Sequence, residues 1–213
     1  MANCPRSILL FGAVQKRSLG VWRPFWQWIG LARMKNGYIT PEWKVTTTPT
    51  FAPRDFPVRE GPRPNTIVGP LHIQCNEHGD PGYLNQLLED VLSWPSVEST
   101  PSSAPLTKVL PLRLKETAVN SDPSAFIGTR EFGRVFLASP TIILALPLVC
   151  AHWAIVKGWA EPHYLRLFGL MPAGAVLIYT PKNCTALAVC YSLFSESYHF
   201  ACKLDGVCMH RSG

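Results

Sequence analysis

The sequence predicts an α+β fold, in which a small antiparallel or mixed sheet packs with helices and the chain ends in a long helix. Segments with a strand-like pattern lie close together in the second half of the chain, and segments with helical spacing lie before, between and after them. The 20 prolines in 213 residues argue against a mostly helical chain and predict an irregular, Pro-rich N-terminal extension.

Apolar spacing defines the first and the last predicted helix. Residues 82–93 place apolar side chains on one helical face, and Pro95 prevents the helix from continuing. These side chains are Tyr83, Leu84, Leu87, Leu88, Val91 and Leu92. Thr180 or Asn183 is the expected N-cap of the final helix. Its predicted apolar face comprises Leu187, Cys190 or Tyr191, Phe194, Tyr198 and Ala201.

Four segments are predicted as strands. Residues 109–119 alternate apolar and polar side chains, and Pro111 favours an edge or an early position. Residues 130–137 and 141–146 form the next two predicted strands, and 173–179 a short fourth one. The uncharged run 139–156 is long enough for a membrane span, but Pro140 and Pro147 break the necessary helix. We therefore expect a buried strand followed by a helix over 148–157 that closes at Gly158.

Charge and composition divide the chain into regions. Residues 1–36 contain no acidic side chain but carry Arg6, Lys16, Arg17, Arg23, Arg33 and Lys35, interspersed with tryptophans. This arm is expected to lie on an anionic membrane surface or to act as a targeting peptide; alternatively it packs on the domain or is disordered. Residues 37–81 are predicted as a Pro-rich strap, 82–205 as the folded domain with a flexible loop at 95–105, and 206–213 as a tail.

Several classes of partner and chemistry lack support in the sequence. The globular part has no excess of positive charge, which disfavours nucleic-acid binding. The seven cysteines form no Cys-x-x-Cys pair, so they are expected to be reduced thiols in an intracellular protein. The histidines show no metal-ligand spacing, and no phosphate loop, Rossmann fingerprint or nucleophile elbow is present. We therefore expect neither a metal nor a cofactor.

Three motifs together resemble one known family. They are GWAEPHYL from Gly158, LMPAGAVLIYTPKN from Leu170, and the helix that ends in SESYHFA. With the GPRP segment from Gly61, these motifs are similar to the luciferase-domain family of fungal and bacterial proteins, which has no settled activity. The resemblance covers most of residues 61–204.

The chain departs from that family in one segment. Members usually carry a segment close to His-Val-His-Pro-Ser-Asp-Gly-Ser-Leu-His-Leu, and the same frame here reads RVFLASPTIIL, residues 134–144. Arg134, Phe136 and Ile143 replace the three histidines, and Ser139 replaces the aspartate. Imidazoles at such positions would converge on one face of a sheet. The resemblance therefore implies a pocket that is more apolar here than in the family.

The candidate catalytic residues are Glu161, His163, Arg134 and Tyr179. His163 is expected to act as a general base or hydrogen-bond donor that Glu161 orients, in a cleft shared with Tyr179. Alternatively, Glu161 pairs with Arg166 at a helix end and His163 is a satisfied turn residue. Arg134 is expected to hold a carboxylate, carbonyl or phosphate, or else to pair with Glu131 or Asp122. The candidate substrate-binding residues are Phe136, Ile143, Trp153 and Trp159.

A cofactor-independent cyclase or isomerase fits these residues. An apolar pocket can hold two reacting ends of a hydrophobic terpenoid or polyketide together while a donor polarises a carbonyl, as in a Diels–Alder closure. The fungal branch of the family implies a tailoring role in secondary metabolism. The alternatives are a noncatalytic membrane-associated module that binds a lipid or a partner, and an inactive family member.

Overall fold

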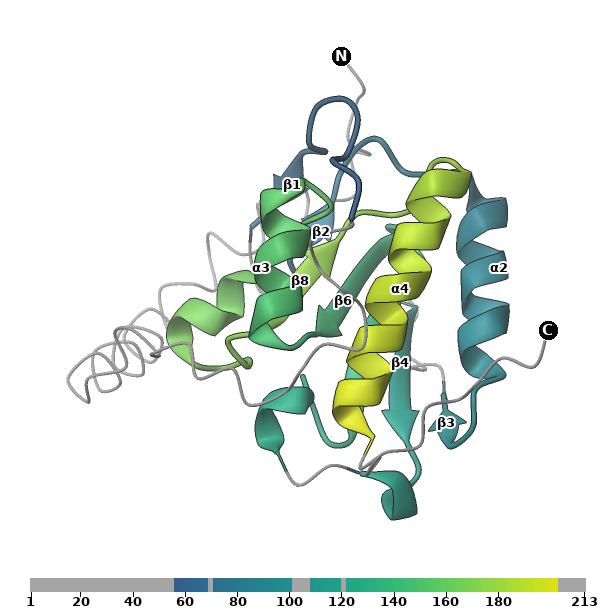
Figure 1. The fold of residues 1–213 in the computed structure, drawn as a ribbon, viewed down its shortest axis with the longest axis vertical. Helices are drawn as coiled ribbons and strands as arrows, with labels where there is room; N and C mark the ends of the chain where they lie inside the picture. The colour runs from purple at the N-terminus through teal and green to yellow at the C-terminus, as the bar shows by residue number, and fades with distance from the viewer. Residues whose placement is uncertain (1–55, 69–70, 101–107, 120–121, 203–213) are drawn as a thin grey trace, which may run out of the picture.

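The computed structural model describes residues 56–68, 71–100, 108–119 and 122–202. Within these ranges the chain forms an α+β fold, as predicted, with the helices α2 (Pro81–Leu92), α3 (Leu148–Val156) and α4 (Cys184–Ala201) (Figure 1). The short 3-10 helices are η2 (Glu116–Ala118), η3 (Pro123–Ala125) and η4 (Tyr164–Phe168). The strands are β1 (Thr66–Ile67), β2 (Ile73–Gln74), β3 (Val97–Glu98), β4 (Val109–Leu114), β5 (Glu131–Phe136), β6 (Thr141–Ala145), β7 (Ala160–Pro162) and β8 (Ala175–Ile178).

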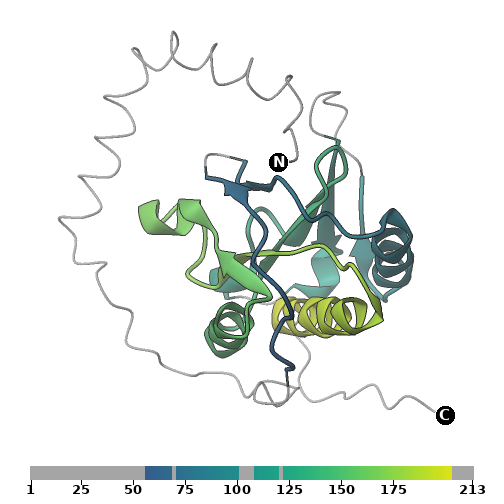
Figure 2. The same cartoon turned by 90° about the horizontal axis from the view of Figure 1, so that it is seen from above.

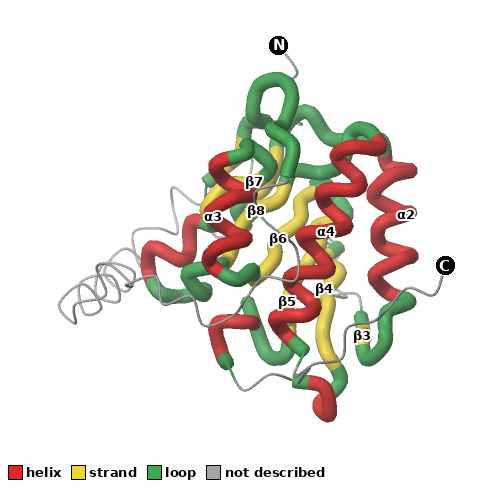
Figure 3. The backbone as a smooth tube through the Cα atoms, viewed as in Figure 1, coloured by secondary structure: helices red, strands yellow, loops and turns green. Residues whose placement is uncertain are grey.

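Six strands form one sheet in the order β3-β4-β5-β6-β8-β7, and every neighbouring pair is antiparallel (Figure 3). The register aligns one row of residues across four strands: Arg134 lies opposite Ile143, Ile143 opposite Leu177, and Leu177 opposite Glu161. Because paired residues share a face, these four side chains point to the same side of the sheet. The strands β1 and β2 form a separate antiparallel pair.

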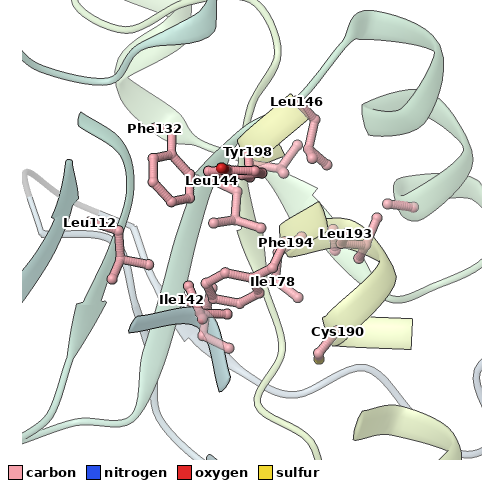
Figure 4. Packing of buried hydrophobic residues seen from close by; sticks show 14 of the residues in the cluster. Leu112, Phe132, Ile142, Leu144, Leu146, Ile178, Cys190, Leu193, Phe194 and Tyr198 are labelled. Atoms are coloured by element: carbon pink, nitrogen blue, oxygen red, sulfur yellow. The ribbon is translucent and has the colours of Figure 1, made fainter. Parts of the chain in front are cut away.

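The helices cover the opposite face of the sheet. Figure 2 shows α3 and α4 on one side and the β1–β2 pair on the other. Phe194 and Leu193 of α4 are fully buried against sheet residues such as Leu144 and Ile178 (Figure 4). Burying a side chain of this size contributes about 1.5–3 kcal/mol, so this layer is the main hydrophobic core.

A β-bulge in β5 changes which of its side chains face the helices. The register shifts between Leu112 and Arg113, so Phe132 is the extra residue of β5. Both Phe132 and Val135 then belong to the helix-side core, while Arg134 points away from it. Gly133 lies so close to the next strand that a Cβ would stand 2.6 Å from Leu144 Cδ2.

The described part of the predicted strap connects the two faces. The Trp159 indole N–H donates to the Pro57 carbonyl over 2.6 Å. The Arg59 backbone amide donates to the Lys157 carbonyl over 2.9 Å, beside the end of α3. Farther on, the Gln74 backbone amide donates to Thr141 Oγ1 over 2.9 Å, and the Gln74 side-chain oxygen Oε1 accepts from the Thr180 backbone amide over 3.1 Å. These bonds hold β1–β2 over β6 and β8.

Most predicted elements are present, and the differences involve short segments. Residues 97–98, expected in the 95–105 loop, pair with β4 as β3, and residues 160–162, expected as an extended or turn segment, pair with β8 as β7. Asn183, one of the two proposed N-caps, accepts from the Ala186 amide over 2.8 Å. The buried face of α4 includes Val189, Leu193 and Ser197, which the predicted face omitted. The arm 1–36 and the tail lie outside the described residues.

Candidate functional site

Glu161 is the centre of a hydrogen-bond network on the sheet face away from the helices. It lies in the edge strand β7, opposite Leu177 of β8. Its Oε1 lies 2.6 Å from His72 Nε2, and its Oε2 accepts from the Tyr179 hydroxyl over 3.1 Å. Burial acts to raise the pKa of Glu161, but hydrogen bonds from His72, Thr66 and Tyr179 outweigh it and lower that pKa. Glu161 is therefore a carboxylate at neutral pH and a weak base.

The backbone determines the tautomer of His72. Its Nδ1 accepts from the Tyr164 amide over 3.2 Å, so a neutral ring carries its proton on Nε2 and donates it to Glu161. The His72 side chain is only 2% exposed. The residue also has a φ of 43°, in the left-handed region that residues with a Cβ rarely adopt. The local chain is thus held in an unfavourable conformation that places this ring on Glu161.

His163 has a buried donor for which the described part of the chain offers no acceptor. It caps η4, and its Nδ1 accepts from the Leu165 amide over 3.2 Å, so the ring proton is on Nε2. The side chain is fully buried, and among the described residues Nε2 has no hydrogen-bond partner. Burial, followed by the charges of His72 and Arg134, lowers the pKa of His163 to about 4, against a smaller opposing effect of Glu161. His163 is therefore a neutral N–H donor at pH 7.

Two aromatic rings, those of His72 and Tyr179, are hydrogen-bonded to Glu161. The His72 and His163 rings meet edge to face with their centroids 5.0 Å apart. The Arg59 guanidinium lies over the Tyr179 ring, 5.4 Å from its centroid. Burial and the nearby Glu161 charge raise the pKa of Tyr179, so its hydroxyl stays protonated and donates.

Arg134 lies at the other end of the aligned row. Its Nε donates to Glu131 Oε1 over 2.6 Å, which is the ion pair that the sequence offered as an alternative role. Ile143 and Leu177 lie between Arg134 and Glu161 in the register, and three strand spacings put the two backbones roughly 14 Å apart. The charge of Arg134 acts on His163, but within the described residues no hydrogen bond joins it to Glu161 or Tyr179.

Only two of the four candidate substrate-binding residues lie on this face. Phe136 and Ile143 form a small cluster with Ile127, Ala145 and Ala175. Trp159 and Trp153 instead belong to the helix-side core, and the Trp159 indole is bonded to the strap. The two tryptophans therefore lie apart from Phe136 and Ile143, because both pack in the core that includes α3.

The structure also changes the partners that the sequence suggested. Glu161 orients His72 and not His163, and Arg166 donates to the Ala173 carbonyl over 3.1 Å instead of pairing with Glu161. His72 was not among the predicted site residues. It lies 89 positions before Glu161, and no motif in the sequence marks it.

The fold and the site define an α+β protein with a buried histidine–carboxylate–tyrosine network on one sheet face. No family model, curated protein or solved structure matches this chain. Within the described ranges, no three His, Cys, Asp or Glu side chains are grouped to hold a metal ion. None of the helices described has the length and apolarity needed to cross a bilayer.

Proposed function

We propose that this protein is a cofactor-independent enzyme that cyclises or isomerises a hydrophobic, carbonyl-bearing small molecule. The reaction is a Diels–Alder-type closure of a terpenoid or polyketide intermediate. Its setting is fungal secondary metabolism, which the resemblance to the luciferase-domain family suggests. The observation that carries the proposal is the buried Nε2–H of His163, which has no acceptor among the described residues.

A buried donor without an acceptor is costly, typically by about 1–3 kcal/mol, and this cost is recovered when a ligand supplies an oxygen. His163 is suited to this role because its low pKa keeps it neutral, so it donates a hydrogen bond without transferring a proton. Since its Nδ1 is occupied by the Leu165 amide, it cannot act as a base at either nitrogen. Hydrogen-bond donation, and not general base catalysis, is thus the role that the geometry supports.

A Diels–Alder closure needs such a donor and little else. A diene and a dienophile exchange three π bonds for two σ bonds and one π bond, so no atom, electron or proton is gained or lost. A hydrogen bond to a carbonyl conjugated with the dienophile withdraws electron density and lowers the barrier. Holding both ends in contact supplies the rest of the acceleration.

The charges at the site favour an uncharged substrate. Glu131 already neutralises Arg134, and Glu161 is a carboxylate within the network that contacts His72. A carboxylate or phosphate ligand beside His163 would be repelled by Glu161, and Arg134, whose charge acts on His163, is already paired with Glu131. A ketone, enone or ester meets the donor without this penalty.

The substrate must also reach an enclosed nitrogen. The His163 side chain has no exposed surface, whereas Glu161 is 20% exposed. The His72 ring packs directly against His163 and is bonded to Glu161, so its displacement is the step that admits a ligand.

The first experiment compares the metabolites of the native host with and without the gene by mass spectrometry. A precursor that accumulates in its absence is then incubated with the purified full chain, and a product of identical mass is expected. His163→Asn keeps an acceptor for the Leu165 amide but removes Nε2, and it should lower kcat by about 10²–10³-fold. His78→Asn, at an exposed histidine, is the matched control. An unchanged metabolite profile, or a His163→Asn variant as fast as the wild type, contradicts the proposal.

A further inference from the structure

A second row of side chains on the Glu161 face ends at His163. The His163 amide donates to the Ala175 carbonyl over 3.0 Å, so His163 continues the pairing of β7 with β8. Ala175 in turn lies opposite Ala145 of β6. Since side chains two positions apart in a strand share a face, this row lies on the same face as Glu161. The imidazole therefore has two alanines, and no large side chain, as its neighbours in this row.

A row of small residues alone does not define a binding site, but this row ends at a buried donor. The His163 side chain is fully buried, and the described part of the chain offers its Nε2–H no acceptor. The charge of Arg134, on β5, contributes to the lowered pKa of His163, so the imidazole extends from β7 toward the middle of the sheet face. The donor and the two alanines therefore belong to the same part of the structure.

Met171 covers the alanine end of this face. Both alanines belong to a small hydrophobic cluster that is separate from the helix-side core. Among the described residues, two partly buried side chains pack against this cluster, Val109 and Met171. Val109 lies opposite Phe136, at the end away from the alanines. Met171 lies in the turn before β8, where the Ala175 amide donates to the Pro172 carbonyl over 2.9 Å. An unbranched, flexible methionine changes its conformation more readily than a branched or aromatic side chain.

The neighbouring row limits the thickness of a ligand that lies over the alanines. It carries Ile143 beside Ala145 and Leu177 beside Ala175, and all four side chains are buried. Rows on one face of a strand lie about 7 Å apart, because they are two residues apart. A flat body fits beside the aliphatic side chains at this spacing, whereas a globular one would overlap with them.

We propose that the apolar part of the substrate lies over Ala145 and Ala175, in the place of the Met171 side chain, while its carbonyl accepts from His163 Nε2. The substrate is then a neutral ketone or ester whose carbonyl is joined to a flat ring or polyene, and Met171 determines specificity. His72 moves to admit the carbonyl, and Met171 moves to admit the apolar body. This inference rests on the proposed function for the donor and the carbonyl, but not on the reaction that follows binding.

The test titrates the ¹⁵N-labelled full chain with 2-acetylnaphthalene, a flat ketone that does not react with thiols, and follows the histidine side-chain resonances by NMR. The ketone should shift the Nε2 resonance of His163 and saturate. Ethylnaphthalene substituted at the same position has this shape without the oxygen, and it should bind at least about fivefold more weakly. The globular ketone 1-acetyladamantane should bind at least about tenfold more weakly than 2-acetylnaphthalene.

Met171→Ala removes the side chain that the ligand has to displace. It should bind 2-acetylnaphthalene at least about threefold more tightly than the wild type, because the ligand no longer has to select a state with the site open. Leu170→Ala is the matched control, since this neighbouring leucine is 38% exposed and does not belong to the cluster. The control should bind the ketone with the wild-type Kd.

The outcomes separate this inference from the proposed reaction. The inference is overturned by an unshifted His163 Nε2 resonance, by equal binding of the flat ketone and either comparison compound, or by equal Kd values of Met171→Ala and Leu170→Ala. The expected differences support it even if no cyclised product is found, and in that case the proposed reaction alone fails. Turnover of a host precursor with the same KM in both variants confirms the reaction and overturns this inference.

Discussion

His163 should make the folded state sensitive to mild acid. The pKa of this histidine falls from its ordinary value of 6.5 to about 4 in the folded protein. Between these two pH values the unfolded chain binds a proton that the folded chain does not, so stability falls as the pH falls. Because one pKa unit corresponds to about 1.4 kcal/mol, the loss from pH 7 to pH 4 due to this residue is about 3 kcal/mol.

His163→Asn isolates this contribution. The Asn side chain retains an oxygen for the Leu165 amide but does not titrate, so its smaller size lowers stability by a similar amount at every pH. The free energy of unfolding is measured by urea denaturation with circular dichroism at several pH values. We expect the decrease between pH 7 and pH 4 to be about 3 kcal/mol smaller in the variant than in the wild type. His78→Asn, at an exposed position, should follow the wild-type profile.

Parallel pH profiles for the wild type and His163→Asn would refute the reasoning. They would mean that His163 is protonated as easily in the folded state as in the unfolded one. The conclusion that the His163 ring is neutral at pH 7, on which the proposed function depends, would then be wrong. A pH titration of the His163 ring by NMR gives the same answer independently, since the ring should stay neutral down to about pH 4.

Three further predictions concern stability. Glu161→Gln removes the carboxylate that accepts hydrogen bonds from two side chains and should lower the free energy of unfolding by about 1–3 kcal/mol at pH 7. Because the pKa of Glu161 is lowered in the folded state, this loss of stability should shrink as the pH falls through that pKa. Urea denaturation at several pH values measures both effects. Asn183→Ala should cost about 1 kcal/mol in chemical denaturation by uncapping α4, whereas Ser192→Ala, on the exposed side of the same helix, should change stability little. Gly174→Ala should lower the thermal midpoint by several degrees, because its Cβ would stand 1.9 Å from the Leu146 carbonyl oxygen and the backbone would have to shift.

Elements that depend on residues close together in the sequence could be predicted from it. The helix α2 has regular apolar spacing and a nearby proline, and α4 is capped by Asn183, one of the two candidate caps. The strands β3 and β7 could not be predicted, because segments of two or three residues become strands only through their neighbours. Glu161 illustrates this point: its place in β7 depends on pairing with β8, and the sequence indicated only an extended or turn segment.

The site residues divide in the same way, into those with a local signal in the sequence and those without one. Glu161 and Tyr179 were chosen from motifs, and the pairing of β7 with β8 brings them within hydrogen-bonding distance. His72 had no such signal, because its approach to Glu161 depends on β1–β2 pairing and on the bonds of Gln74 across the sheet. A contact between residues 89 positions apart carries no local pattern.

The strand register shows where three positions of the segment 134–144 lie on the sheet. Arg134 lies opposite Ile143 and Phe136 opposite Thr141, so Arg134, Phe136 and Ile143 share the face that holds Glu161. These are the positions where the family that the sequence resembles carries histidines. Three imidazoles there would form a basic, protonatable surface. In this chain these three positions hold one cation, which is paired with Glu131, and two apolar side chains. At the β7 edge, the neutral donor of His163 and the weakly basic carboxylate of Glu161 suit the proposed activation of a carbonyl better than proton transfer.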